Sequence, residues 1–152
     1  MNEYRITKYN PENRTNGIYT VHEWTSIHDV GKTFHDGTFS FSEYKKVEKA
    51  YVDCCIELIQ TANILELSVC CPECYDDKVC LPPQLSEESD IRRVVMCCLQ
   101  ERCWAKLESE CFYIHFGYDY HMYVGTDIPY LMAEKIARRY NLYCEVFSSP
   151  YR

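Results

Sequence analysis

Cysteines are the residues with the widest chemical range in this chain of 152 residues, which contains 11 of them. Cys71 and Cys74 have the two-residue spacing that zinc sites and redox sites both use, and Cys80 follows. A structural zinc site usually has a second pair of ligands, and none with the usual spacing follows. A redox motif should open a helix, whereas Tyr75–Asp77 is typical of a loop. We therefore expect free thiols, no metal and no cofactor, and keep zinc bound by Cys71, Cys74 and Cys80 as the alternative.

A cysteine–histidine pair is the next chemistry to consider. Cys111 and His115 fall on one face of a predicted strand, but their Cβ atoms would then lie about 13 Å apart, too far for proton transfer. No cysteine stands in a recognisable nucleophile turn, and no glycine-rich phosphate loop, HExxH motif or calcium loop occurs. We expect a protein that is not an enzyme, and a small cysteine-dependent enzyme is the less favoured alternative.

Charge restricts the class of partner. The chain has 16 Lys and Arg residues against 23 Asp and Glu residues, which gives a formal net charge of -7. An acidic balance disfavours nucleic acid and favours a basic protein partner. Residues Met1–Arg5 are polar, unlike a signal peptide, and no run approaches the roughly 18 apolar residues of a membrane helix. We expect a cytoplasmic protein with reduced thiols and no contact with membrane or nucleic acid.

Aromatic and acidic residues are the candidates for a binding surface. The chain has 14 Tyr, 6 Phe and 2 Trp residues, most densely between Phe112 and Tyr123, and tyrosine is enriched in interface hot spots. Carboxylates concentrate between residues 73 and 90. The candidate partner-binding residues are Asp76, Asp77, Glu87, Glu88, Asp90, Tyr118, Asp119, Tyr120 and Trp24.

Hydrophobic periodicity indicates the elements that must position these residues. Ser40 and Glu43 form a capping-box pattern before a helix whose buried face starts at Tyr44 and whose polar face includes Glu48. A second helix is predicted over residues 91–106 and a third over 127–140. Strands are predicted over residues 3–9, 65–70, 111–116, 120–124 and 142–147.

This order of elements predicts an α+β fold in one globular domain, residues 1–152. We expect a single mainly antiparallel sheet of about four or five strands covered by three helices. In the predicted hairpin, Phe112, Ile114 and Phe116 face one side and Tyr113 and His115 the other. Either one face enters the core and the second faces solvent or a partner, or the strand is buried on both sides.

Three stretches, Tyr4–Pro11, Glu23–Lys32 and Phe112–Gly125, give the chain a family resemblance. Together they resemble small cytosolic immunity proteins of bacterial contact-dependent inhibition and related polymorphic toxin systems. The resemblance implies a stoichiometric inhibitor that binds a cognate toxin domain, often a basic nuclease, and blocks its active site or its substrate. It assigns no individual contact residue, and the thiols between Cys70 and Cys80 are not a feature of that group. A zinc-stabilised protein-interaction domain therefore remains an alternative, and the oligomeric state stays open.

Overall fold

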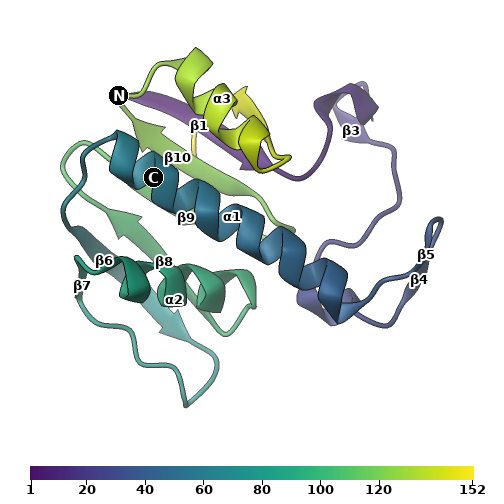
Figure 1. Cartoon of the computed structure of the whole chain (residues 1–152), viewed down its shortest axis with the longest axis horizontal. Coiled ribbons are helices and arrows are strands. Elements are labelled where there is room, and N and C mark those ends of the chain that lie inside the picture. The colour runs from purple at the N-terminus through teal and green to yellow at the C-terminus, as the bar shows by residue number, and fades with distance from the viewer.

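The protein has two layers, a seven-stranded sheet and three helices that cover one of its faces (Figure 1). The structure is a computed structural model that describes residues 1–152. Its strand order is β11-β1-β10-β9-β8-β6-β7, and every neighbouring pair is antiparallel. The predicted α+β fold is confirmed, but the sheet has seven strands where four or five were expected.

The elements follow one another along the chain without an internal repeat. The helices are α1 (Phe41–Thr61), α2 (Glu88–Leu99) and α3 (Tyr130–Arg139). The strands of the large sheet are β1 (Asn2–Thr7), β6 (Leu67–Cys74), β7 (Gln84–Leu85), β8 (Cys103–Glu108), β9 (Tyr113–Phe116), β10 (Met122–Thr126) and β11 (Tyr143–Val146). Two small hairpins pair β2 (Arg14–Thr15) with β3 (Ile18–Tyr19) and β4 (Thr33–Phe34) with β5 (Gly37–Thr38).

Helix α1 begins at the predicted capping box and lies between α3 and α2 (Figure 1). The Ser40 hydroxyl accepts a hydrogen bond from the Glu43 amide, and the Glu43 carboxylate accepts one from the Ser40 amide. These bonds satisfy donors that the first turn of a helix leaves unpaired. The prediction that Glu48 lies on the polar face is wrong, because Glu48 is 1% exposed. Its carboxylate accepts hydrogen bonds from the Tyr44 hydroxyl and the Gln100 side-chain amide.

The second predicted helix, residues 91–106, is two elements rather than one. Helix α2 ends at Leu99, and Glu101, with a φ of 56°, turns the chain into β8. Burial alternates along β8, so Cys103, Ala105 and Leu107 face the helices while the residues between them face the opposite side of the sheet. Burial of every second residue is typical of a strand. This strand was not predicted from the sequence because the apolar run of α2 comes shortly before it and suggested one continuous helix.

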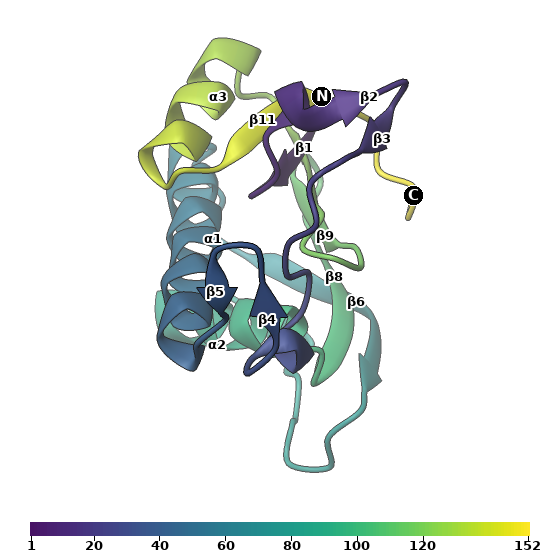
Figure 2. The same cartoon turned by 90° about the vertical axis from the view of Figure 1, so that its right-hand side faces the viewer.

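The sheet face opposite the helices is crossed by the C-terminal segment, residues 147–152 (Figure 2). The Tyr151 ring packs against Trp104 and Tyr123, with ring centroids 5.7 and 5.9 Å apart. Tyr113 and His115 are therefore buried, at 6% and 1% exposure. Of the two alternatives for the hairpin, the strand buried on both sides is confirmed and the face exposed to solvent is wrong. The hairpin itself is confirmed, since β9 and β10 pair in antiparallel register.

No helix of the protein is both long enough and apolar enough to cross a membrane. Thirty-five buried hydrophobic residues form one cluster, which includes six of the seven cysteines that lie outside residues 70–80. The exception is Cys111, which is exposed and precedes β9 rather than lying in it.

Candidate functional site

One end of the sheet collects segments that lie far apart in the sequence. Because neighbouring strands are antiparallel, the end of β6, the start of β8 and the turn between β9 and β10 all meet there. The loop that follows β6 projects beyond this end of the sheet (Figure 2). Its first residue, Tyr75, donates its amide hydrogen to the carbonyl of Arg102, 2.9 Å away, in the turn before β8.

Two exposed tyrosines lie at this end. Tyr75 is 60% exposed and Tyr118, in the turn between β9 and β10, is 77% exposed. The Tyr75 hydroxyl donates a 2.8 Å hydrogen bond to the Glu73 carboxylate. That bond, together with partial burial and the negative charge of Glu73, raises the pKa of Tyr75 to about 12. Tyr75 therefore stays protonated as a large amphipathic side chain, the kind that anchors protein interfaces.

Exposed carboxylates surround the two tyrosines. Glu101 and Asp119 both line one small pocket, and both stand in turns with positive φ, 56° and 57°. Glu101 also accepts a hydrogen bond from the Ser26 hydroxyl and lies 2.8 Å from His28 Nε2, so the segment before α1 is tied to this end. We name the following set the tyrosine–acid surface: Glu73, Tyr75, Asp77, Glu101, Tyr118 and Asp119.

The first group of predicted contact residues lies on or beside this surface. Asp77, Tyr118 and Asp119 are exposed on it. Asp76 is adjacent but forms an ion pair with Arg102, with 2.8 Å between Oδ2 and Nε. Hydrogen bonds from the Lys78 amide and from Arg102 lower the pKa of Asp76. Arg102 therefore partly neutralises the charge of Asp76. Asp76 attracts a basic partner less strongly than the sequence suggested.

The second predicted group lies elsewhere. Glu87, Glu88 and Asp90 stand at the start of α2, whereas the tyrosine–acid surface lies beyond its end. The 12 residues of α2 separate the two groups by about 18 Å. Glu88 and Asp90 also form ion pairs within the helix, with Arg92 and Arg93. The acidic run from 73 to 90 is therefore two separate groups.

Tyr120 and Trp24 lie beneath the surface rather than on it. Tyr120 is 6% exposed, and its hydroxyl donates to the Tyr44 hydroxyl, 2.7 Å away, so its predicted role as a surface contact is wrong. Trp24 is half-buried and stacks on Phe39, with ring centroids 4.3 Å apart. Both side chains support the turn and the loop that carry the exposed residues.

Sequence reasoning missed Tyr75, Glu101 and Glu73 as candidate contacts. Tyr75 could have been found, because an aromatic residue beside two aspartates in a predicted loop is a typical exposed anchor. Glu101 could not, because it was placed inside a predicted helix and its exposure depends on the turn before β8.

The thiols of the CxxC pattern do not converge. Cys71, Cys74 and Cys80 are all exposed, and no group of three or more His, Cys, Asp or Glu side chains is arranged to hold a metal ion. Cys71 has a φ of 51° and lies where the register of β6 against β8 shifts. The CxxC pattern therefore coincides with a bulge in β6 near the edge of the sheet. Such bulges hinder the pairing of an edge strand with another chain.

A serine, a histidine and a glutamate form a hydrogen-bonded row on the covered face of the sheet. His115 Nδ1 lies 2.8 Å from Ser149 Oγ, and His115 Nε2 lies 2.8 Å from Glu108 Oε1. These are the residue types of a hydrolase triad, but Ser149 is 7% exposed and also accepts a hydrogen bond from the Tyr151 amide. A substrate could not reach the hydroxyl, so the row fastens the C-terminal segment to β8 and β9.

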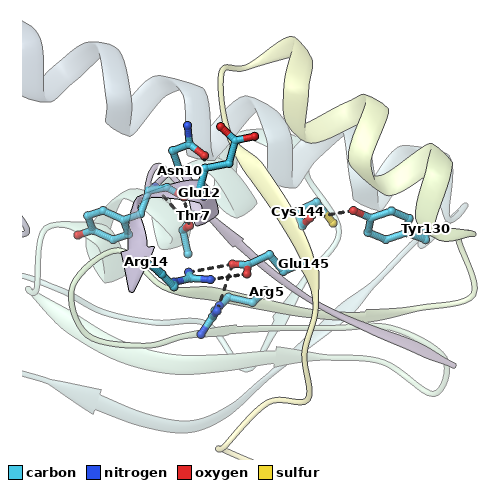
Figure 3. A network of polar contacts seen from close by, with 9 residues as sticks. Arg5, Thr7, Asn10, Glu12, Arg14, Tyr130, Cys144 and Glu145 are labelled. Atoms are coloured by element: carbon cyan, nitrogen blue, oxygen red, sulfur yellow. Dashed lines mark hydrogen bonds and ion pairs between the residues drawn. The ribbon is translucent and has the colours of Figure 1, made fainter. Parts of the chain in front are cut away.

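An ion-pair network joins β1, β2 and β11 on the same face. Figure 3 shows Arg5 and Arg14 both directed at Glu145, which accepts two hydrogen bonds from Arg14 and one of 3.1 Å from Arg5. Burial alone would raise the pKa of the Glu145 carboxyl, but the hydrogen bonds and charges of the two arginines outweigh burial and lower it. Both cations are engaged by this carboxylate, so the network holds the β2–β3 hairpin against the sheet.

Comparison with known proteins adds nothing to this geometry. No protein-family model, no curated protein and no solved structure matches the chain. A functional proposal therefore depends on the tyrosine–acid surface and on the sequence resemblance.

Proposed function

We propose that this chain is a toxin-neutralising immunity protein that acts in the cytoplasm of a bacterium. It binds a cognate toxin domain, a basic nuclease, through the tyrosine–acid surface. The observation that carries the proposal is the pair of exposed tyrosines, Tyr75 and Tyr118, set among exposed carboxylates at one end of the seven-stranded sheet.

The surface has the two properties that tight inhibition of a basic protein needs. Tyrosine buries a large area and loses little rotamer freedom, so Tyr75 and Tyr118 can fill pockets at the centre of an interface. The carboxylates around them attract a basic surface over a long range and increase the rate of association.

Inhibition of this kind needs no chemistry from the inhibitor. A nuclease binds its substrate through a basic face, because each phosphate must be neutralised. Carboxylates such as Asp77, Glu101 and Asp119 present negative charges to that face. The bound immunity protein then excludes the nucleic acid sterically and electrostatically, at a ratio of one inhibitor to one toxin.

Co-expression tests the function itself. The reading frames beside the gene for this chain are screened for a toxin domain, which is expressed alone and together with the chain. We expect growth arrest from the toxin, rescue by the chain and a complex that co-purifies. If no neighbouring toxin is relieved by the chain, the immunity function is wrong.

Tyrosine variants test the position of the interface. Truncating a hot-spot tyrosine costs about 2 kcal/mol, so Tyr75→Ala and Tyr118→Ala should each weaken the complex by roughly 30-fold. Tyr143→Ala is the matched control, because Tyr143 is partly exposed on β11, at the opposite edge of the sheet from β6 and β7. Binding affinity is measured by calorimetry. A loss confined to the Tyr143 variant would place the interface elsewhere.

Two triple variants decide which acidic group attracts the toxin. Serine at Asp77, Glu101 and Asp119 should slow association at low salt and flatten its dependence on ionic strength. Serine at Glu87, Glu88 and Asp90 removes the same formal charge at the start of α2 and should change the rate much less. Stopped-flow association kinetics provide the comparison. The opposite ranking would assign the contact to the start of α2.

A further inference from the structure

The end of α2 and the start of β8 bring two buried thiols together. Cys98 Sγ and Cys103 Sγ lie 3.7 Å apart, and the two residues are 8% and 2% exposed. The turn between them folds the chain back on itself. The amide of Glu101 donates to the carbonyl of Cys98, and the amide of Arg102 donates to the carbonyl of Cys97, at 3.1 and 3.0 Å.

Among the buried cysteines, Cys98 and Cys103 are the two whose sulfur atoms contact each other at 3.7 Å, although Cys97 also lies near Cys103 and helps to lower its pKa. Cys54 and Cys55 are adjacent on α1, but the Cys55 sulfur contacts the Met122 sulfur at 3.2 Å and neither thiol contacts the other. Cys144 on β11 has no sulfur neighbour within hydrogen-bond distance. Two sulfur atoms that already touch need only small side-chain rotations to reach bonding distance.

The surroundings give the two thiols different roles. A hydrogen bond from Cys98 and the positive charge of Arg102 lower the pKa of Cys103 against the effect of burial. The same hydrogen bond and burial raise the pKa of Cys98. Cys103 is therefore the better nucleophile, and Cys98 is placed to resolve an oxidised Cys103.

We propose that Cys98 and Cys103 form a reversible oxidation site for hydrogen peroxide, at which they are converted into a disulfide. Cys103 loses its proton to form a thiolate, which attacks one peroxide oxygen. The O–O bond breaks, and the departing hydroxide takes up the proton that Cys103 lost and becomes water. The Cys98 sulfur then attacks the sulfenic acid on Cys103 and displaces hydroxide, which takes the Cys98 proton. In total two thiols and one peroxide give one disulfide and two waters.

Burial selects the oxidant. A side chain that is 2% exposed admits a molecule of the size of water or peroxide, whereas a bulky disulfide such as oxidised glutathione cannot reach it. The inference does not depend on the immunity function. The disulfide would, however, close the turn that carries Glu101 and Arg102. Arg102 contacts the neighbouring loop twice: its side chain forms an ion pair with Asp76, and its carbonyl accepts a hydrogen bond from the Tyr75 amide.

Peptide mapping of the full chain tests the site. Cys71, Cys74, Cys80 and Cys111 are exposed and are replaced by serine to prevent bonds between molecules. The folded protein is treated with stoichiometric peroxide. It is then unfolded in denaturant that contains the alkylating reagent, so that every remaining thiol is blocked, and it is cut with trypsin. Trypsin cleaves after Arg93, Arg102 and Lys106, so the two thiols fall on different peptides, 94–102 and 103–106.

We expect these two peptides to be joined in high yield, with the mass of two hydrogens lost, and to separate on reduction. Cys97→Ser should leave the cross-link intact, whereas Cys98→Ser should abolish it. In Cys98→Ser the sulfenic acid on Cys103 is captured by a dimedone probe that is present as the protein is unfolded. Cys54 and Cys55 should remain free and serve as buried controls.

The peptide mapping described above keeps all the buried cysteines and needs no substitution at Cys98. The proposal can therefore be tested even if Cys98→Ser does not fold. A cross-link that persists in Cys98→Ser and disappears in Cys97→Ser would overturn the assignment. So would full alkylation of Cys98 and Cys103 after peroxide treatment of the folded protein.

Discussion

Glu48 places a carboxylate between α1 and the end of α2. It accepts hydrogen bonds from the Tyr44 hydroxyl and the Gln100 amide and forms an ion pair with Lys45. Sequence periodicity assigned it to the polar face of α1, because a charged residue beside a lysine such as Lys49 is usually solvated. A buried carboxylate is tolerated here because each oxygen has a donor.

Removing the Glu48 carboxylate should destabilise the protein. Glu48→Ala leaves the Tyr44 hydroxyl and the Gln100 amide without their acceptor, and such losses cost about 2 kcal/mol of unfolding free energy. Urea denaturation followed by circular dichroism measures the change. Glu66→Ala, at an exposed carboxylate, is the control and should stay within about 0.5 kcal/mol of wild type. Equal stability of both variants would contradict the role of Glu48.

At the scale of elements, local signals decided where α1 begins but not where α2 ends. The capping box of α1 lies within four consecutive residues and is readable from sequence. The end of α2 depends on Glu101 adopting a positive φ, which glutamate does only where tertiary contacts favour it. β8 was missed for the same reason, and its pairing with β6 and β9 brings the loop after β6 and the turn after β9 to one end of the sheet.

The capping box gives a direct test at this scale. Ser40→Ala removes the acceptor for the Glu43 amide and should lower the unfolding free energy by about 1 kcal/mol. Ser42→Ala, an exposed position in the first turn of α1, is the matched control and should have little effect. Thermal and urea unfolding of the two variants give the comparison. If Ser42→Ala is the more damaging change, the cap does not stabilise α1 as described.

At the scale of the whole molecule, the C-terminal segment closes the sheet face that the helices leave uncovered. Besides the row through His115, Arg152 forms an ion pair with Glu3, 2.6 Å between Nη1 and Oε1. Tyr113 stacks on His115 beneath this segment, with ring centroids 4.2 Å apart. The segment thus buries aromatic residues that an isolated hairpin would expose.

Stability should fall as the pH falls below about 6.5. Burial lowers the pKa of His115 from its ordinary value of 6.5, although Glu108 opposes the shift, and burial also lowers the pKa of His121. Below pH 6.5 the unfolded chain therefore binds more protons than the folded one, so stability is fully present above that pH and is lost as the pH falls through the folded pKa values. Melting temperatures between pH 5 and pH 7.5 measure the effect.

Histidine variants provide the control for this pH dependence. His115→Gln removes one buried titrating group and should flatten the decline between pH 7.5 and pH 5. His22→Gln, at an exposed histidine, should leave the slope of the wild type unchanged. A wild-type protein equally stable at both ends of the range would contradict the burial argument.

The sequence by itself determined the α+β class, the start of α1, the β9–β10 hairpin and the acidic, tyrosine-rich character of the chain. These features depend on caps, periodicity and composition, which are local or additive. The tertiary structure alone decided that the acidic run divides into two groups, that Tyr120 is buried while Tyr75 and Tyr118 are exposed, and that Cys98 meets Cys103. Those outcomes depend on strand pairing between distant segments, and no local pattern encodes which segments meet.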